Sequence, residues 1–391
     1  MKRISIVILI LGTCFVPAAW GQKITCPTQF NWTEFHTIDM ARWNPCEKVL
    51  NVNNVGNLQL LWSYNTNNTG LGYVESSPAV ANGGVYVGSY FGSLGGNLYA
   101  LNAKTGAKLW SYATATITES SPAVANGVVY VGSSGLSDTV YALNANTGAK
   151  LWSYKTGNWV DSSPAVANGI VYVGSLDGNV YALNARTGAI LWAYTTGIGV
   201  VQSSPAVANG VVYVGSENFV SKDGAVYALD AQTGALLWTV PSSYVSSSPA
   251  VANGLVYVGS YDNNVYALNA KTGSMVWSYT TGGQVGSSPA VADGVVYVGS
   301  FDGNVYALNA RTGALLWSYS TGNHVSSSPA VANGVVYVGS WDNNVYALNA
   351  RTGALLWSFT TGSFVESSPA VANGVVYVGS DDGKVYAFGL K

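Results

Sequence analysis

The sequence predicts an all-β fold, an eight-bladed β-propeller of four-stranded antiparallel blades, and three observations lead to it. A unit of about forty residues occurs eight times between residues 58 and 391, and each unit holds four short apolar runs. One strand that the last unit lacks is found ahead of the first unit. Repetition at this period is typical of an architecture in which every unit is one supersecondary element.

The repeat is most easily followed through its Ser-Pro-Ala-Val segment. Successive prolines of this segment are 44, 42, 41, 44, 40, 40 and 40 residues apart. These prolines are Pro78, Pro122, Pro164, Pro205, Pro249, Pro289, Pro329 and Pro369. The intervals indicate eight units of one kind without long insertions.

Each unit reads as four strands joined by tight turns. In the sixth unit the apolar runs are 288–291, 295–299, 305–309 and 315–319. Short runs of Val, Tyr, Leu and Trp bounded by Gly, Asn and Asp are typical of strands. Pairs such as Asp302-Gly303 favour two-residue hairpin turns, which need positive φ. A β-solenoid would use shorter coils and an immunoglobulin-like array longer units, so four strands per unit favour a propeller blade.

The ends of the chain indicate how the ring closes. The last third strand, 385–388, runs directly into the terminus at Lys391 without a fourth strand. A run of the fourth-strand type, 60–64, stands ahead of the first Ser-Pro-Ala-Val segment. We therefore expect the N-terminal strand around Trp62 to complete blade eight, which leaves no blade open.

A longer motif identifies a resemblance to a known superfamily. The pattern Ala-x-(Asn/Asp)-x-x-Thr-Gly-x-x-x-Trp occurs intact seven times, for example at 100–110, 228–238 and 347–357. Residues 58–391 thereby resemble the PQQ-like repeat propellers, also called quinoprotein alcohol dehydrogenase-like. The resemblance implies that each tryptophan stacks on the Thr-Gly backbone of the next blade, where glycine permits close approach. The implied docking residues are Trp62, Trp110, Trp152, Trp192, Trp238, Trp277, Trp317 and Trp357. The superfamily includes dehydrogenases, assembly lipoproteins and sensor domains, so it implies a fold and not a function.

The N-terminal residues predict export. Lys2-Arg3 followed by an apolar run reads as a signal peptide over 1–21, with Gln22 as the first mature residue. Secretion to the extracellular space, the cell surface or the periplasm is expected. The apolar run is too short for a lasting transmembrane span. Cys14 resembles a lipoprotein cysteine only faintly, because threonine precedes it, and no lipid anchor is expected.

An N-terminal extension, 22–57, precedes the propeller. It contains Cys26 and Cys46, which we expect to form a disulfide in an exported chain. A redox pair would instead favour Cys-x-x-Cys spacing. We expect the extension to cover an edge of the propeller.

Composition removes several classes of function. Charged residues make up 9% of the chain and the net charge is −2, so a nucleic-acid partner is not expected. Two histidines, His36 and His324, are too few for a histidine-rich metal site. No Gly-x-Ser-x-Gly elbow or phosphate-binding loop is found. The resemblance implies a vicinal cysteine pair and long insertions for a PQQ- and calcium-dependent dehydrogenase, and the sequence has neither.

Differences among the eight copies concentrate on one face of the predicted ring. The loop leading into the first strand and the loop between strands two and three share this face. The other two loops, Ala-Asn-Gly and Asn-Ala-Arg-Thr-Gly, hardly vary and share the opposite face. We call these the variable face and the invariant face. Binding determinants are expected on the variable face.

Three positions vary most there. Three residues before each Ser-Ser-Pro stand Tyr73, Ile117, Trp159, Val200, Tyr244, Gln284, His324 and Phe364. One residue before it stand Glu75, Glu119, Asp161, Gln202, Ser246, Gly286, Ser326 and Glu366. Just after the second strand stand Tyr90, Leu176, Tyr261, Phe301, Trp341 and Asp381. The first two positions are two apart on a strand and should point the same way.

These positions supply the candidate site residues. The ligand-binding candidates are Tyr73, Trp159, Tyr244, His324, Phe364, Tyr261, Phe301 and Trp341. The metal or cation candidates are Glu75, Glu119, Asp161 and Glu366, which neighbouring blades would place in an arc at the mouth of the central channel. Aromatic rings beside carboxylates suit a small cation, a sugar or a peptide. The alternative is that these side chains only fill gaps and that the acids are solvated.

The sequence therefore favours an exported, non-catalytic propeller that binds or scaffolds a protein, glycan or cell-envelope partner without a cofactor. A surface protein that assembles with itself through its repeated blades is one alternative. An oxidoreductase that uses PQQ and calcium is the other.

Overall fold

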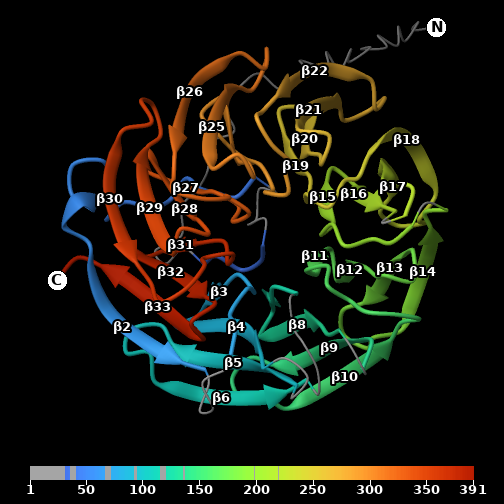
Figure 1. The fold of residues 1–391 in the computed structure, drawn as a ribbon. Coiled ribbons are helices and arrows are strands. Elements are labelled where there is room, and N and C mark those ends of the chain that lie inside the picture. Colours follow the sequence, from blue (N-terminus) through green and yellow to red (C-terminus); the bar gives the residue numbers. More distant parts are fainter. Residues whose placement is uncertain are drawn as a thin grey trace, which may run out of the picture.

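The computed structural model describes residues 31–35, 41–66, 72–91, 95–114, 120–134, 137–197, 199–218 and 220–391. These residues form eight sheets arranged as blades of four antiparallel strands around a common centre (Figure 1), and a short strand of the N-terminal extension adds a fifth to one of them. The prediction of an eight-bladed, all-β propeller is confirmed. No helix within these residues has the length and apolar character needed to cross a membrane.

Each blade runs from a short innermost strand to an outermost one. Blade one is β3 (Ala79–Ala81), β4 (Gly84–Tyr90), β5 (Gly96–Asn102) and β6 (Lys108–Ala113), and blade two is β7 (Ala123–Ala125), β8 (Val128–Gly132), β9 (Thr139–Asn144) and β10 (Lys150–Lys155). Blade three is β11 (Ala165–Ala167), β12 (Ile170–Gly174), β13 (Asn179–Asn184) and β14 (Ile190–Thr195). Blade four is β15 (Ala206–Ala208), β16 (Val211–Glu217), β17 (Asp223–Asp230) and β18 (Leu236–Ser243). Blade five is β19 (Ala250–Ala252), β20 (Leu255–Gly259), β21 (Asn264–Asn269) and β22 (Met275–Thr280), and blade six is β23 (Ala290–Ala292), β24 (Val295–Gly299), β25 (Asn304–Asn309) and β26 (Leu315–Ser320). Blade seven is β27 (Ala330–Ala332), β28 (Val335–Gly339), β29 (Asn344–Asn349) and β30 (Leu355–Thr360). Blade eight is β31 (Ala370–Ala372), β32 (Val375–Ser380), β33 (Lys384–Gly389) and β2 (Gln59–Asn65). A two-residue strand, β1 (Trp43–Asn44), and a 3₁₀ turn, η1 (Val55–Asn57), belong to the N-terminal extension.

Blade six illustrates why the repeat folds in this way. Val296 and Val298 on β24 are fully buried between blades. The turn from β23 to β24 has positive φ at Asp293 (49°) and Gly294 (77°), as a two-residue hairpin requires. The turn from β25 to β26 has Gly313 at φ 73°. Apolar alternation and turn residues thus specify the same four strands.

The outermost strand of every blade carries a β-bulge near its start. In blade six Leu315 pairs with Leu308 and Trp317 pairs with Ala307, so Leu316 is an extra residue. The same irregularity recurs in the other seven blades. A bulge interrupts the in-out alternation of a strand. The side chains of the two residues before each docking tryptophan therefore do not alternate between the two faces of the blade, as side chains of the inner strands do.

The tryptophans lie between successive blades. Trp317 Nε1 donates a hydrogen bond to the Ala350 carbonyl of blade seven at 2.9 Å. Its ring covers Gly353, where a Cβ atom would lie 2.8 Å from the ring. The other docking tryptophans donate in the same way, Trp62 to Ala103, Trp110 to Ala145, Trp152 to Ala185, Trp192 to Ala231, Trp238 to Ala270 and Trp277 to Ala310.

The ring closes through the N-terminal strand. β2 pairs antiparallel with β33 and completes blade eight, and Trp62 Nε1 lies 3.0 Å from the Ala103 carbonyl of blade one. Blade eight has no turn after its third strand, so Trp357 Nε1 donates instead to the Leu58 carbonyl at 3.1 Å. The predicted closure is confirmed.

The described part of the N-terminal extension lies against the innermost strands. The carbonyls of Trp32, Thr33, Ala41 and Arg42 accept backbone hydrogen bonds from valines of blades one, two, six and seven at 2.6–3.0 Å. β1 also pairs in parallel with β27. The inner edges of these strands would otherwise have unpaired N–H groups. The extension therefore lines the centre of the ring.

Arg42 holds this extension in place. Its side chain is fully buried, and its guanidinium donates to the Pro329 carbonyl at 2.9 Å and to the Phe35 carbonyl at 2.5 Å. It lies 4.5 Å from the centroid of the Phe35 ring. Burial lowers the pKa of Arg42 to about 9. Arg42 thus ties Phe35 to the wall of the channel.

Several predictions fall outside the described residues. They concern the signal peptide, Cys14 and Cys26. Cys46 is described and buried, and its N–H donates to Asn44 Oδ1 at 2.9 Å. The pairing of Cys26 with Cys46 stays a prediction.

Candidate functional site

Hydrogen bonds between loops define the two faces of the ring. On the invariant face the Ala310 N–H donates to the Gly294 carbonyl at 2.9 Å. This bond joins the two turns of blade six whose sequences hardly vary among the eight repeats. On the variable face the Trp341 N–H donates to the His324 carbonyl at 2.9 Å, and the Phe301 N–H donates to the Gln284 carbonyl at 2.8 Å. The variable positions of one blade therefore lie side by side.

The Ser-Ser steps build two layers of hydrogen bonds around the channel. The second serine of each blade donates its N–H to the second-serine hydroxyl of the next blade, from Ser77 to Ser121 at 2.9 Å and finally from Ser368 back to Ser77 at 3.0 Å. The first serines link strands and blades, since Ser327 Oγ donates to the Ser367 carbonyl and accepts from the Gly339 N–H. The serines are structural, and the second layer lines the channel with hydroxyl groups.

A cavity of about 250 Å³ lies at the mouth of the channel on the variable face. Its lining includes the carboxylates of Glu75, Asp161 and Glu366, the second-layer serines, Tyr261, and Phe35 of the N-terminal extension. The extension thus forms part of the cavity that the variable positions surround.

Three carboxylates from blades one and eight meet at this mouth. One oxygen from each of Glu75, Glu366 and Asp381 lies within 4.8 Å of the others. Burial, with Glu75 nearby, raises the pKa of Glu366 to about 7. Burial, with Glu75 and Glu366 nearby, raises the pKa of Asp381 to about 8. The three groups could hold a cation between them, because a positive charge would relieve their mutual repulsion.

The remaining acids extend this group of carboxyl side chains. Asp161 borders the same cavity and accepts a hydrogen bond from the Ser134 hydroxyl, and burial raises its pKa. Glu217 at the end of β16 is fully buried, and burial, with Asp161 nearby, raises its pKa to about 8. Glu119 lies outside the described residues.

Comparison of the eight repeats in sequence does not single out every acid that lies near the mouth of the channel. Asp381 stands at the third variable position but was not among the cation candidates, and Glu217 and Ser134 occupy that same position in blades four and two. Reading this third position through all eight copies, as for the other two, would have found them.

Six of the aromatic candidates form a continuous row over blades five to eight. The ring centroids of Tyr244 and Tyr261 are 4.5 Å apart, and Phe301 lies 5.7 Å beyond Tyr261. The row continues through His324 and Trp341, and Phe364 stacks on Trp341 at 5.3 Å with an interplanar angle of 7°. The row reaches the cavity at Tyr261.

The other two aromatic candidates lie elsewhere on the same face. Tyr73 stacks on Tyr90 at 5.0 Å, and Tyr90 donates its hydroxyl hydrogen bond to Glu75 at 2.7 Å. Trp159 in blade three is 43% exposed and has no ring partner among the described residues. The structure therefore separates Trp159 from the row.

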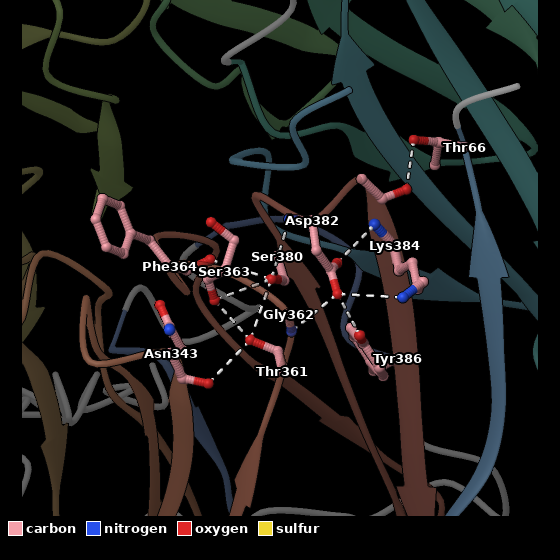
Figure 2. A network of polar contacts seen from close by, with 11 residues as sticks. Thr66, Asn343, Thr361, Gly362, Ser363, Phe364, Ser380, Asp382, Lys384 and Tyr386 are labelled. Atoms are coloured by element: carbon pink, nitrogen blue, oxygen red, sulfur yellow. Dashed lines mark hydrogen bonds and ion pairs between the residues drawn. The ribbon is translucent and has the colours of Figure 1, made fainter. Parts of the chain in front are cut away.

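The aspartates of the hairpin turns are occupied by structural contacts. In Figure 2, Asp382 accepts hydrogen bonds from the Gly362 N–H, the Lys384 N–H and the Tyr386 hydroxyl, and it forms an ion pair with Lys384. Its neighbour Asp381 instead has a buried Oδ1 without a hydrogen-bond partner. The turn aspartates stabilise the loops, whereas Asp381 is available to the mouth.

Raised pKa values make the stability of the ring depend on pH. Folded Glu366 and Asp381 retain their protons to about pH 7 and 8, whereas the unfolded chain loses them near 4.5 and 3.8. Stability should therefore fall as pH rises between these values. Glu366→Gln and Asp381→Asn should each stabilise the protein by about 1–3 kcal/mol near pH 9 and have little effect below about pH 3, where the carboxyls are neutral in both states.

Urea unfolding of each variant at both pH values would test this expectation. Asp293→Asn is the matched control, because it removes a carboxylate from the invariant face at a turn where the other seven blades have asparagine. Equal stabilisation at both pH values, or the same effect in Asp293→Asn, would contradict the assignment of the shift to the mouth.

The cavity does not fit PQQ. PQQ is a flat quinone with three carboxylates, and among the described residues the charged side chains that line the cavity are carboxylates, without a lysine or arginine. Like charges brought together in a partly buried site repel strongly. The mouth suits a positively charged group instead.

Comparison with known proteins agrees with the fold. The family model described as outer membrane protein assembly factor BamB matches residues 94–220, 137–243, 222–328 and 301–391. BamB from Moraxella catarrhalis is 21% identical with a TM-score of 0.70, over 85% of this chain and all of that one. Quinohemoprotein alcohol dehydrogenase from Comamonas testosteroni is 17% identical with a TM-score of 0.76, over 92% of this chain and 80% of that one.

A computationally designed protein, Ika8, is also similar, with 20% identity and a TM-score of 0.72 over 85% of this chain and all of that one. No curated protein matches this chain in sequence. Structural likeness at these identities shows the fold alone. The family matches together span residues 94–391, and the chain therefore belongs to the PQQ_2 family of BamB-like repeat propellers.

Proposed function

We propose that this chain is an exported, non-catalytic binding protein that holds a positively charged group of a protein or other cell-envelope partner at the mouth of its channel. Membership of the BamB-like family supports a binding or scaffold role. The signal-like N-terminus supports export.

The observation that carries this proposal is the composition of the cavity mouth. Glu75, Glu366 and Asp381 converge there, and the row of rings approaches at Tyr261. Carboxylates neutralise a cation, and ring faces attract it through their quadrupoles. A lysine or arginine side chain of a partner could reach both.

Calorimetric titration with a pentalysine peptide tests the proposal. We expect saturable binding by the purified chain and its loss in the double variant Glu75→Gln/Glu366→Gln. The control Asp230→Asn/Asp293→Asn removes two carboxylates from the invariant face and should bind as the parent does. An equal loss of affinity for pentalysine in both double variants would mean that the peptide binds through the net charge of the protein alone, which would overturn the proposal.

The same titration with PQQ and calcium addresses the oxidoreductase alternative. We expect no binding of PQQ, because its carboxylates would meet those of the mouth. Tight, calcium-dependent PQQ binding would favour the dehydrogenase role and contradict a cation site. A pull-down from cell-envelope extract with the parent chain and the Glu75→Gln/Glu366→Gln variant would then identify the partner.

A further inference from the structure

The few charges of the propeller are separated between its two faces. Lysines and arginines gather at the turns of the invariant face that follow the third strands and at the first residues beyond these turns. They are Lys104, Lys108, Lys150, Arg186, Lys271, Arg311 and Arg351. Two acids, Asp230 and Asp293, lie in the described turns of this face, and Glu47 of the extension accepts a hydrogen bond there from the Gly374 N–H at 3.1 Å. The invariant face is therefore basic.

The variable face has the opposite charge. Its described loops and adjoining strand ends contain Glu75, Asp138, Asp161, Asp177, Glu217, Asp223, Asp262, Asp302, Asp342, Glu366, Asp381 and Asp382. The bases at this end are Lys155, Lys222 and Lys384. The disc thus has a strong electrostatic polarity along its axis, although the net charge of the chain is only −2.

A rim of exposed apolar side chains adjoins the basic turns. The bulges at the start of the outermost strands leave these side chains 36–62% exposed, in every blade. They are Leu60, Leu61, Leu109, Leu151, Ile190, Leu191, Leu236, Leu237, Met275, Val276, Leu315, Leu316 and Leu355. They make up most of the large apolar residues that the described part of the chain exposes, so the exposure is concentrated and not scattered.

Cations and apolar side chains share the same grooves between blades. Arg351 and Leu316 line a groove of about 650 Å³ between blades six and seven, and Asp293 is the one acid among the described residues of its lining. Lys104 and Leu61 line the equivalent groove of about 330 Å³ between blades eight and one. The turns and the bulges thus bring together a positive group and an apolar one at matching places around the ring.

We propose that the invariant face is a membrane-binding surface that lies on anionic lipid headgroups. Its lysines and arginines would contact lipid phosphates, while the apolar rim enters the boundary between headgroups and acyl chains. The occupant is a lipid surface because a dissolved polyanion would use the basic turns but not the apolar rim. A second copy placed with its own invariant face against this one is disfavoured because two basic faces repel each other, and a copy stacked head to tail through its acidic face is an outcome that sedimentation equilibrium would reveal.

This orientation does not depend on the binding role proposed for the channel mouth. An anionic membrane would repel the acidic variable face, so the channel mouth would point away from the lipid. The ring would lie flat, with all its basic turns near the headgroups at once. Several weak contacts would then act together.

Cosedimentation with lipid vesicles tests the proposal. We expect the purified chain to bind vesicles of phosphatidylglycerol mixed with phosphatidylcholine and not vesicles of phosphatidylcholine alone. Arg311→Glu/Arg351→Glu should weaken this binding on the order of tenfold or more, given about 1 kcal/mol for each basic residue near the surface. Lys155→Glu/Lys222→Glu makes the same change in net charge on the variable face and should bind as the parent does.

A second pair of variants tests the apolar rim. Leu237→Gln/Leu316→Gln should weaken vesicle binding but leave binding to polyphosphate, a lipid-free polyanion, unchanged. Equal effects of the two charge-reversal variants would overturn the proposed face. Unchanged vesicle binding in the glutamine variant would overturn the lipid assignment, as would a dimer in sedimentation equilibrium that this variant dissociates. All variants keep the same N-terminus, so a contribution from the signal-like segment cancels.

Discussion

Trp62→Ala is expected to lower the free energy of unfolding by about 3–5 kcal/mol, as much as removal of a docking tryptophan in the middle of the chain. Trp62 is 9% exposed, donates to the Ala103 carbonyl at 3.0 Å and covers Gly106 of blade one. Its removal leaves a cavity between blades eight and one, at the junction where the N-terminal strand closes the ring, and the Ala103 carbonyl keeps only the hydrogen bond from the Tyr377 hydroxyl at 3.2 Å. Urea unfolding followed by tryptophan fluorescence measures the effect.

Two further variants serve as the reference and the control for this measurement. Trp317→Ala breaks the equivalent contact between blades six and seven and should cost a similar amount. Trp159→Ala removes a tryptophan that is 43% exposed on the variable face and should have little effect. If Trp62→Ala behaved like Trp159→Ala, the N-terminal strand would not be closing the ring.

Gly313→Ala should destabilise the propeller by about 2–4 kcal/mol. Gly313 has φ 73°, and a Cβ atom there would lie 2.7 Å from the Trp277 ring of the preceding blade. The substitution therefore combines backbone strain with the displacement of a packed indole. The same unfolding experiment reports the loss.

Gly294→Ala, in the same blade, separates these two contributions. Gly294 has φ 77°, but an added Cβ would meet nothing within 4 Å. It should cost about 1 kcal/mol, the backbone part alone. Equal losses at Gly313 and Gly294 would mean that the tryptophan does not need the glycine beneath it.

Much of the fold could be predicted because the sequence repeats its local signals. Asn-Gly or Asp-Gly at the turns and alternating valines mark the same strands in every copy, so errors in one copy are corrected by the others. The closure was predictable by counting, since one outermost strand was missing after 385–388 and present at 60–64. The β-bulges were not predicted, because a bulge depends on pairing with the neighbouring strand.

The candidate site could be predicted only in part. The alignment of copies located Glu75, Glu366 and the row of rings, because variation against a repeated background marks positions that are free of the repeat's structural role. It did not single out Glu217, nor did it bring Asp381 to Glu75 and Glu366. Distances between side chains of different blades depend on how the ring closes.

By itself, the sequence determined the number of blades, their strands, their docking tryptophans and the face on which they differ. These properties follow from local periodicity and from counting. Only the tertiary structure decided that the extension lies inside the ring, that Phe35 lines the cavity, and that Asp381 meets Glu75 and Glu366. The physical reason is that burial and the convergence of side chains depend on distances between blades far apart in the chain, which exist only once the ring has closed.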